Sequence, residues 1–155
     1  MYNLELLTLV QPREPRRYRD QPNLGDSADV LARFPLFKGV SKRRLRKLAR
    51  SARHAEFAPG ETIVFAGDHD DLLYVILAGH VKTSRGDGRV LRTGDYFGDV
   101  TPSGGLPRSA TVVALSYVHV MKLPSRSILK LARRHSAIAL TLLRDLTTRL
   151  HQLEA

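Results

Sequence analysis

The sequence predicts a mainly β domain with helices on either side of its sheet region. Between residues 54 and 122, short runs rich in Val, Ile, Leu and Tyr are separated by turn signals roughly every ten residues, a spacing typical of an antiparallel barrel or sandwich. Before and after this region, apolar residues recur at helical spacing. With 155 residues, of which 43% are hydrophobic, the chain has the size of one domain with its own core.

The first 26 residues are predicted to form a flexible N-terminal arm, and the domain is predicted over 27–155. Residues 11–26 contain three prolines and no apolar periodicity. The opening residues carry Glu5 and no basic cluster, which is a poor signal peptide, and no apolar run approaches the length of a membrane span. We therefore expect a cytoplasmic protein that does not bind membranes.

Helical signals precede the sheet region. Ser27 is a candidate N-cap for a helix over 27–34, which Pro35 ends. Ser41 is a candidate N-cap for a second helix over 42–53. The apolar stripe of this second helix comprises Leu45, Leu48, Ala49 and Ala52.

The predicted sheet region contains a hairpin tip and an acidic turn. Gly86-Asp87-Gly88 is a hairpin signal, and the last strand is expected to end at Pro124. His69-Asp70-Asp71 lies at a turn, and we expect its side chains to be solvated. The six histidines show no metal-ligand spacing and the chain has no cysteine, so we predict neither a metal site nor an enzyme.

Two helices are predicted after the sheet region, with Ser125 capping one that runs to residue 134 and Ser136 capping a long one that runs to residue 153. In the long helix, apolar residues recur at the a/d spacing of a coiled-coil seam: Ala139, Leu143, Leu146, Leu150 and Leu153. Two interpretations stand side by side. The seam joins two copies of the chain in a homodimer, or it packs on the sheets of its own domain.

The net charge of +10 is unevenly distributed. Residues 38–53 contain eight Lys or Arg and no acid. The helix from Lys42 to Arg53 is therefore a candidate surface for nucleic acid or an acidic partner. Most charge runs of this kind are the solvated face of a helix, and no aromatic side chain interleaves with this one for base stacking. We do not favour a nucleic-acid partner on the sequence alone.

Residues 97–112, FGDVTPSGGLPRSATV, combine groups that bind an anion and a sugar. Arg108 presents a planar fork that pairs with phosphate and keeps its charge, and hydroxyl residues Ser109 and Thr111 follow it. The glycine-bearing turn before it can direct backbone N–H groups at the same anion. The carboxylate of Asp99 can accept a hydrogen bond from a sugar hydroxyl. Phosphate and ribose together indicate a nucleotide.

This segment resembles the phosphate-binding cassette of cyclic-nucleotide-binding domains, and the resemblance extends over about residues 28–153. The matching residues in the cassette are Phe97, Gly98, Asp99, Pro107, Arg108, Ser109 and Ala110. Outside it, the matching stretches are Pro35-Leu36-Phe37, Pro59-Gly60-Glu61, Ala66-Gly67-Asp68 and Leu73-Tyr74-Val75-Ile76-Leu77. The resemblance implies an antiparallel β-barrel or jelly roll with N-terminal helices and a long C-terminal helix, like the sensor domain of the cAMP receptor protein.

The resemblance also implies roles for the cassette residues. Arg108 and Ser109 would bind the cyclic phosphate, with the N–H of Thr101 directed at the same group. Gly98 and Asp99 would lie at the ribose. Asp99 stands where the family has the longer Glu. Two interpretations are therefore open: Asp99 accepts a hydrogen bond from the ribose 2′-OH, or it is only a turn residue.

The sequence departs from the family once more in the cassette, and the resemblance also implies contacts to the base. Thr101-Pro102 replaces the Ala-Leu that the family usually carries, which removes an apolar contact to the last helix. By the same resemblance, Thr83 and Leu91 line the base pocket, and Arg149 or Leu153 closes over the base.

The resemblance implies a sensor rather than a catalyst. The chain ends at Ala155 without the winged helix-turn-helix of related transcription regulators, so we expect a stand-alone module that regulates an unknown effector protein. The favoured ligand is cAMP, with cGMP as the alternative, and no metal. The competing interpretation is a degenerate member that binds no nucleotide and acts as a scaffold or as a basic nucleic-acid- or acidic-partner-binding protein.

Overall fold

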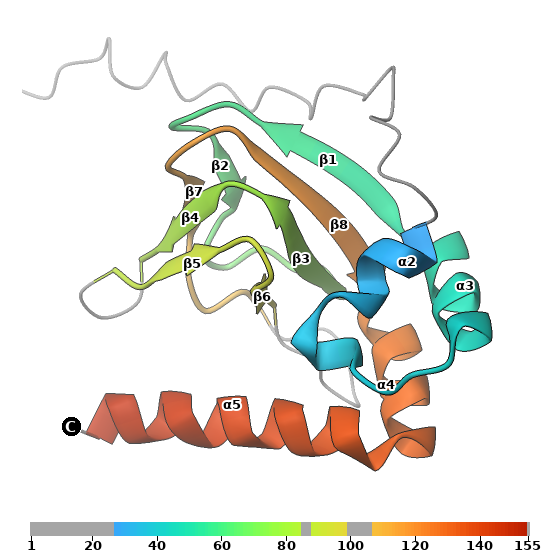
Figure 1. The fold of residues 1–155 in the computed structure, drawn as a ribbon. Coiled ribbons are helices and arrows are strands. Elements are labelled where there is room, and N and C mark those ends of the chain that lie inside the picture. The colour runs from blue at the N-terminus through green and yellow to red at the C-terminus, as the bar shows by residue number, and fades with distance from the viewer. Residues whose placement is uncertain (1–26, 85–87, 99–106, 155) are drawn as a thin grey trace, which may run out of the picture.

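The computed structural model describes residues 27–84, 88–98 and 107–154. Helices α2 (Ser27–Ala32), η1 (Pro35–Phe37) and α3 (Lys42–Arg50) precede the strands, and α4 (Ser125–Arg134) and α5 (Ser136–Glu154) follow them (Figure 1). The predicted arm, the hairpin tip 85–87 and the centre of the cassette lie outside the described residues. No helix in the described ranges is both long and apolar enough to cross a membrane.

The strands form two antiparallel sheets, with strand orders β1-β8-β3-β6 and β2-β7-β4-β5. Their bounds are β1 Arg53–Phe57, β2 Thr62–Val64, β3 Leu72–Ala78, β4 His80–Thr83, β5 Val90–Arg92, β6 Tyr96–Phe97, β7 Val112–Ala114 and β8 Val118–Pro124. This confirms the predicted mainly β architecture with flanking helices. The last strand ends at Pro124, as predicted.

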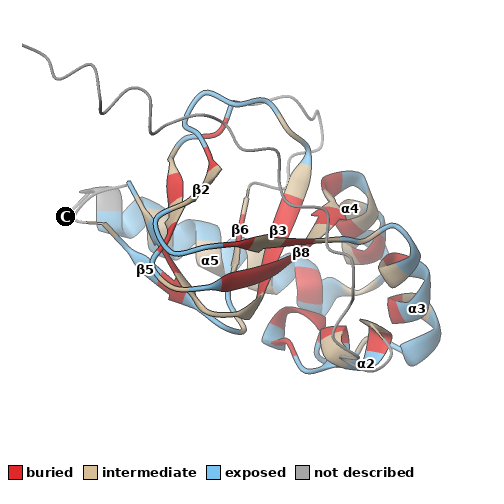
Figure 2. Ribbon diagram, turned by 90° about the horizontal axis from the view of Figure 1, so that it is seen from above, coloured by how far each residue is buried: buried red, intermediate tan, exposed pale blue. Residues whose placement is uncertain are grey.

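Two apolar cores share strand β3, whose side chains alternate between them. Tyr74 and Ile76 point into an intersheet core built from both sheets. Leu73 and Val75 point to the opposite face, where α2, η1, α3, α4 and the first turn of α5 form a helical core (Figure 2). This period-two alternation is what a strand covered on both faces requires. The sheets and the helical layer are thereby joined through one strand.

The helix boundaries follow the sequence signals only in part. Ser41 caps α3 as predicted, its side chain accepting a hydrogen bond from the N–H of Arg44 at 3.4 Å. The helix ends at Arg50, earlier than predicted, because Arg53 already pairs with β8. Ser125 is the first residue of α4 rather than its cap, and its N–H bonds the carbonyl of Asp71 at 2.8 Å.

Helix α5 packs through a different stripe from the one expected. Ile138 is fully buried and Leu142 is partly buried against the helical core. The leucines of the predicted seam are instead exposed: Leu143 by 60%, Leu146 by 47% and Leu150 by 61%. The interpretation that this seam packs on the sheets of its own domain is therefore wrong. The homodimer remains a prediction.

Candidate functional site

Arg108 is held by its backbone to the turn between β2 and β3. Its N–H bonds the carbonyl of Asp68 at 2.7 Å, and its carbonyl accepts from the N–H of Gly67 at 2.8 Å. The residue is 8% exposed. A cation buried to this degree requires compensating partners.

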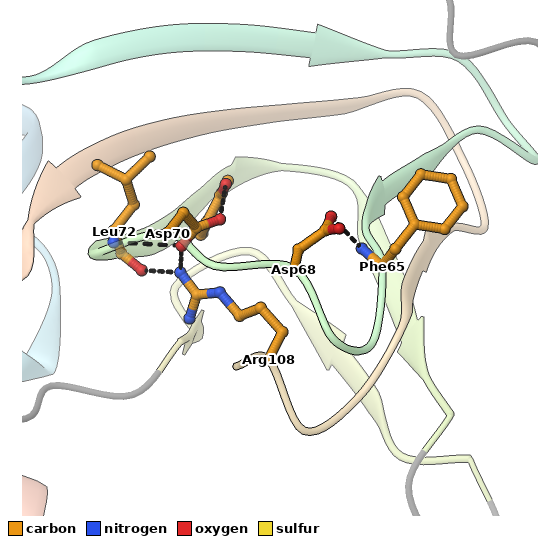
Figure 3. A network of polar contacts seen from close by, with 6 residues as sticks. Phe65, Asp68, Asp70, Leu72 and Arg108 are labelled. Carbon is orange, nitrogen blue, oxygen red and sulfur yellow. Dashed lines mark hydrogen bonds and ion pairs between the residues drawn. The ribbon is translucent and has the colours of Figure 1, made fainter. Parts of the chain in front are cut away.

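The partners of Arg108 come from the start of β3. Its Nη2 donates to Oδ1 of Asp70 and to the carbonyl of Leu72 (Figure 3). The other carboxylate oxygen of Asp70 accepts from the hydroxyl of Tyr74 at 3.1 Å. The Tyr74 ring lies 5.4 Å from Arg108 Cζ and stacks on Phe97 with a centroid distance of 4.7 Å. The expectation that Asp70 is simply solvated is wrong.

Gly98 lies directly against the guanidinium. Its φ of +107° is a conformation that a residue with a Cβ rarely adopts. A Cβ at this position would lie 2.6 Å from the carbonyl oxygen of Leu72 and 2.7 Å from Nη1 of Arg108. The structure thus brings together the glycine and the arginine that open and close the predicted cassette.

A buried donor of the guanidinium lacks a partner in the described part of the chain. Among the described residues, Nε of Arg108 is the buried side-chain atom with no hydrogen-bond partner. Leaving such a donor unpaired costs about 1–3 kcal/mol. Nε and Nη2 form the side-on edge of the guanidinium, which pairs with two oxygens of a phosphate or carboxylate. An anion there would satisfy Nε and would compete with Asp70 for Nη2.

Electrostatics keep the arginine charged and the tyrosine neutral. Burial lowers the pKa of Arg108 and the carboxylate of Asp68 opposes that shift. Because an arginine starts far above neutral pH, it remains a cation. Burial, and then the charge of Asp68, raise the pKa of Tyr74 to about 12, so its hydroxyl stays protonated and donates to Asp70.

Of the remaining residues predicted to contact the ligand, some lie in the described ranges and others do not. Ser109 is exposed beside Arg108. Thr83 is half-buried and pairs with Val112, whereas Leu91 is buried in the intersheet core. Arg149 is half-buried on α5. The residues that lie outside the description are Asp99, Thr101 and Pro102, together with the side chain of Leu153.

A hydrogen bond joins α5 to β6, the strand that leads into the cassette. The hydroxyl of Tyr96 donates to Oδ2 of Asp145. Burial, followed by this hydrogen bond, raises the pKa of Tyr96, and the charges of Arg149 and Arg89 oppose the shift. Tyr96 precedes Phe97-Gly98, so α5 is attached one residue away from the cassette. No local signal in the sequence indicates this pair, since its members are 49 residues apart.

No group of three or more metal-ligating side chains occurs in the described ranges. What the site offers is a buried cation with a spare donor, next to a glycine turn and inside a rigid strand framework. Fold and site together define a small domain whose buried arginine offers a donor to an anionic ligand.

Residues 54–135, just over half of the chain, match the cyclic nucleotide-binding domain. The protein belongs to this family, which confirms the resemblance noted in the sequence.

Individual relatives point to the same domain in larger proteins. The chain is 33% identical over 104 residues to a cGMP-dependent protein kinase of Toxoplasma gondii, which covers 66% of this chain and 10% of the kinase. It is 27% identical over 131 residues to a CRP-like cAMP-activated global transcriptional regulator of Mycobacterium tuberculosis, covering 80% of this chain and 58% of the regulator. The solved structure of cAMP-bound PfPKA-R superposes with a TM-score of 0.68 at 22% identity, over 82% of this chain and 46% of that one.

Proposed function

We propose that this protein binds cAMP as a regulatory ligand and passes the binding event to a partner protein. The observation that carries the proposal is the buried Arg108, whose Nε lacks an acceptor among the described residues while Gly98 lies against the same guanidinium. A cyclic phosphate supplies two oxygens to one edge of an arginine. The ligand would thus complete the hydrogen bonding of a cation that the fold already places.

The other cassette residues complete the proposed site. Ser109, which is exposed beside Arg108, and the N–H of Thr101 would bind the phosphate. Gly98 and Asp99 would lie at the ribose. For the base, we propose Thr83, which is half-buried on β4, and Arg149 of α5, which lies near enough to Tyr96 for its charge to lower the pKa of that tyrosine.

The preference for cAMP over cGMP rests on the cassette and on the extent of the matches. Arg108-Ser109-Ala110 resembles the Arg-Ser-Ala sequence of transcription regulators that use cAMP. The cAMP-activated regulator matches 80% of this chain, against 66% for the cGMP-dependent kinase. We also propose that the protein is cytoplasmic.

Calorimetric titration with cAMP, cGMP and adenosine tests the proposal. We expect cAMP to bind more tightly than cGMP, and adenosine, which lacks the phosphate, to give no signal. Arg108→Ala should weaken cAMP binding by about 30- to 1,000-fold, because truncating one partner of a desolvated charged pair costs about 2–4 kcal/mol. Arg92→Ala, at an exposed arginine of β5, is the matched control and should bind like the wild type.

Arg108→Lys guards against misfolding of the alanine variant. Lysine keeps the charge beside Asp70 but loses the planar fork, so we expect a folded protein with an intermediate loss of affinity. If the wild type gives no signal with cAMP or cGMP, or if Arg108→Ala binds cAMP as well as Arg92→Ala does, the proposal fails. The non-binding scaffold would then be the better account.

A second titration addresses Asp99. If its carboxylate accepts from the ribose 2′-OH, the wild type should bind cAMP about tenfold more tightly than 2′-deoxy-cAMP, which corresponds to one hydrogen bond to a charged group. Asp99→Ala should bind the two ligands equally. Equal binding of both ligands by the wild type would assign Asp99 to the turn alone.

We also propose that two copies associate through α5. The exposed leucines Leu143, Leu146 and Leu150 follow the a/d spacing, and burying each one would contribute about 1.5–3 kcal/mol. Light scattering on the wild type should give a dimer, and Leu143→Glu with Leu150→Glu should give a monomer. Arg144→Glu with Thr148→Glu, on exposed positions of the same helix, is the control and should remain dimeric. A monomeric wild type at all concentrations would exclude this interface.

A further inference from the structure

The helical end of the domain carries a dense positive surface that the nucleotide site does not use. Helix α3 contains six Lys or Arg and α4 contains four, whereas residues 30–55 and 100–144 contain no Asp or Glu. Within the described ranges, Asp29 pairs with this region and contacts Lys42 at 2.9 Å. Ten cations therefore share two helices that contain no acidic residue of their own.

The two helices contribute to the same core at one end of the domain. Leu45 and Leu48 of α3 pack in the same core as Ile128 and Leu131 of α4. Arg44 contacts the ring nitrogen of His135, which follows α4. Both views place α3 and α4 at the same end of the molecule (Figures 1 and 2). The apolar face of each helix is turned inward, so the charged faces are turned to solvent.

On each helix the exposed cations form one stripe. Arg43, Arg46, Lys47 and Arg50 are spaced i, i+3, i+4 and i+7 on α3, and Arg126, Lys130, Arg133 and Arg134 are spaced i, i+4, i+7 and i+8 on α4. Residues with this spacing lie on one helix face. We call these eight residues the basic double stripe.

The composition of the double stripe argues against two modes of binding, insertion into a lipid surface and stacking on unpaired bases. Neither helix exposes a large apolar side chain, which a helix needs to insert into a lipid surface. Neither helix contains an aromatic residue on which unpaired bases could stack.

A nucleic-acid duplex has the matching charge density. It carries one negative charge per about 1.7 Å of axis, so the roughly 15 Å length of a ten-residue helix corresponds to about nine phosphates. Most cations in the double stripe are arginines, whose fork suits phosphate. We propose that the basic double stripe binds the phosphate backbone of a nucleic-acid duplex without reading its sequence.

The test is fluorescence anisotropy of the full 155-residue chain with a labelled 24-base-pair DNA duplex of random sequence. We expect binding at 50 mM salt that weakens by about 10²- to 10³-fold at 200 mM, as the release of counterions from about five phosphates requires. The triple variant Arg43→Glu, Lys47→Glu, Lys130→Glu should lose at least tenfold in affinity. The control triple Lys82→Glu, Arg92→Glu, Arg144→Glu makes the same charge change at exposed positions elsewhere and should stay within about twofold of the wild type.

Several outcomes would overturn the proposal. They are no binding of the duplex at 50 mM salt, an equal loss in both triple variants, or tighter binding of single strands, poly-glutamate or anionic lipid vesicles than of the duplex. Circular dichroism and cAMP titration on both triple variants establish that the fold and the nucleotide site are intact. Because Arg108 is not altered, a failure here leaves the cAMP proposal standing.

Discussion

The surroundings of Arg108 and helix α5 are held in opposite ways. Arg108 contacts a carboxylate, a carbonyl and an aromatic ring, all fixed by the strands. Helix α5 is anchored by Ile138 and Leu142 near its start, and by the hydrogen bond from Tyr96 to Asp145 further along. The surroundings of Arg108 are thus built into the sheets, whereas Ile138, Leu142 and Asp145 are the contacts named for α5 in the described part of the chain.

This difference suits a sensor. If Arg108 binds phosphate as proposed, its preformed position would lower the cost of ordering the site when ligand binds. In the proposed sensor, the ligand would select between arrangements of α5 through differential contacts. Tyr96 belongs to both regions, since it precedes the cassette glycine and bonds α5.

Gly98→Ala should have the largest effect on stability and on cAMP affinity, because Gly98 lies directly against Arg108. The Cβ would meet the Leu72 carbonyl and the Arg108 guanidinium at a positive φ. We expect the free energy of unfolding to fall by about 2–4 kcal/mol, from backbone strain plus overpacking, and the affinity for cAMP to fall at least tenfold. Urea unfolding and calorimetry measure the two.

Gly94→Ala is the matched control for this change. Gly94 has a similar φ of +96° but nothing within 4 Å of its Cβ position. It should therefore cost only the strain, about 1–2 kcal/mol, and leave cAMP binding intact. Equal losses of stability and of cAMP affinity in the two variants would show that close packing of Gly98 against Arg108 is not the cause.

Asp70→Asn removes the charge that now pairs with Arg108. The buried cation loses its counter-ion, so the free energy of unfolding should fall by about 1–3 kcal/mol in the absence of ligand. The bound phosphate then replaces the missing charge, and cAMP should raise the melting temperature more than it does in the wild type. Asp68→Asn, on an exposed carboxylate of the same turn, should change neither quantity by as much.

Tyr96→Phe tests how firmly α5 is attached to the sheets. It removes the hydroxyl that bonds Asp145, at an expected cost of about 0.5–1.5 kcal/mol in the local stability of α5. Amide hydrogen exchange in residues 140–152 should accelerate about 2- to 10-fold. Tyr117→Phe, which removes a hydroxyl bonded to Glu56 away from α5, should leave that exchange unchanged. Unchanged exchange in Tyr96→Phe would mean that other contacts hold the helix.

The smallest effect should come from a histidine pair away from both regions. Nδ1 of His54 lies 2.9 Å from Nε2 of His119, and burial lowers the pKa of both rings. Below about pH 6.5 the unfolded chain then binds more protons than the folded one, so stability falls as the pH falls. Melting temperatures between pH 7.5 and 5.5 should show this decline. His54→Gln should flatten it, whereas His151→Gln, at an exposed position, should not.

The sequence was sufficient for the features that depend on local signals. Turn residues and alternating apolar runs located the sheet region, and Ser41 marked the start of α3. The anion cassette was identified because its glycine and arginine lie close together in the chain, and the structure places Gly98 against Arg108.

Long-range pairs could not be predicted in this way. Asp70 and Arg108 are 38 residues apart, and Tyr96 and Asp145 are 49 apart. Only the packing of strands against one another brings such residues together. The face of α5 was misassigned in part because two apolar stripes share the helix, and burial selects Ile138 and Leu142 over the a/d seam.

The central claim is that a cyclic phosphate binds the guanidinium of Arg108. The most direct measurement is the ¹H–¹⁵N resonance of Arg108 Nε, assigned by its loss in Arg108→Lys. We predict a downfield proton shift and slower exchange of this group on addition of cAMP, and no change with adenosine, because only cAMP supplies the missing acceptor. Saturation of the protein with cAMP without any change in this resonance would contradict the account.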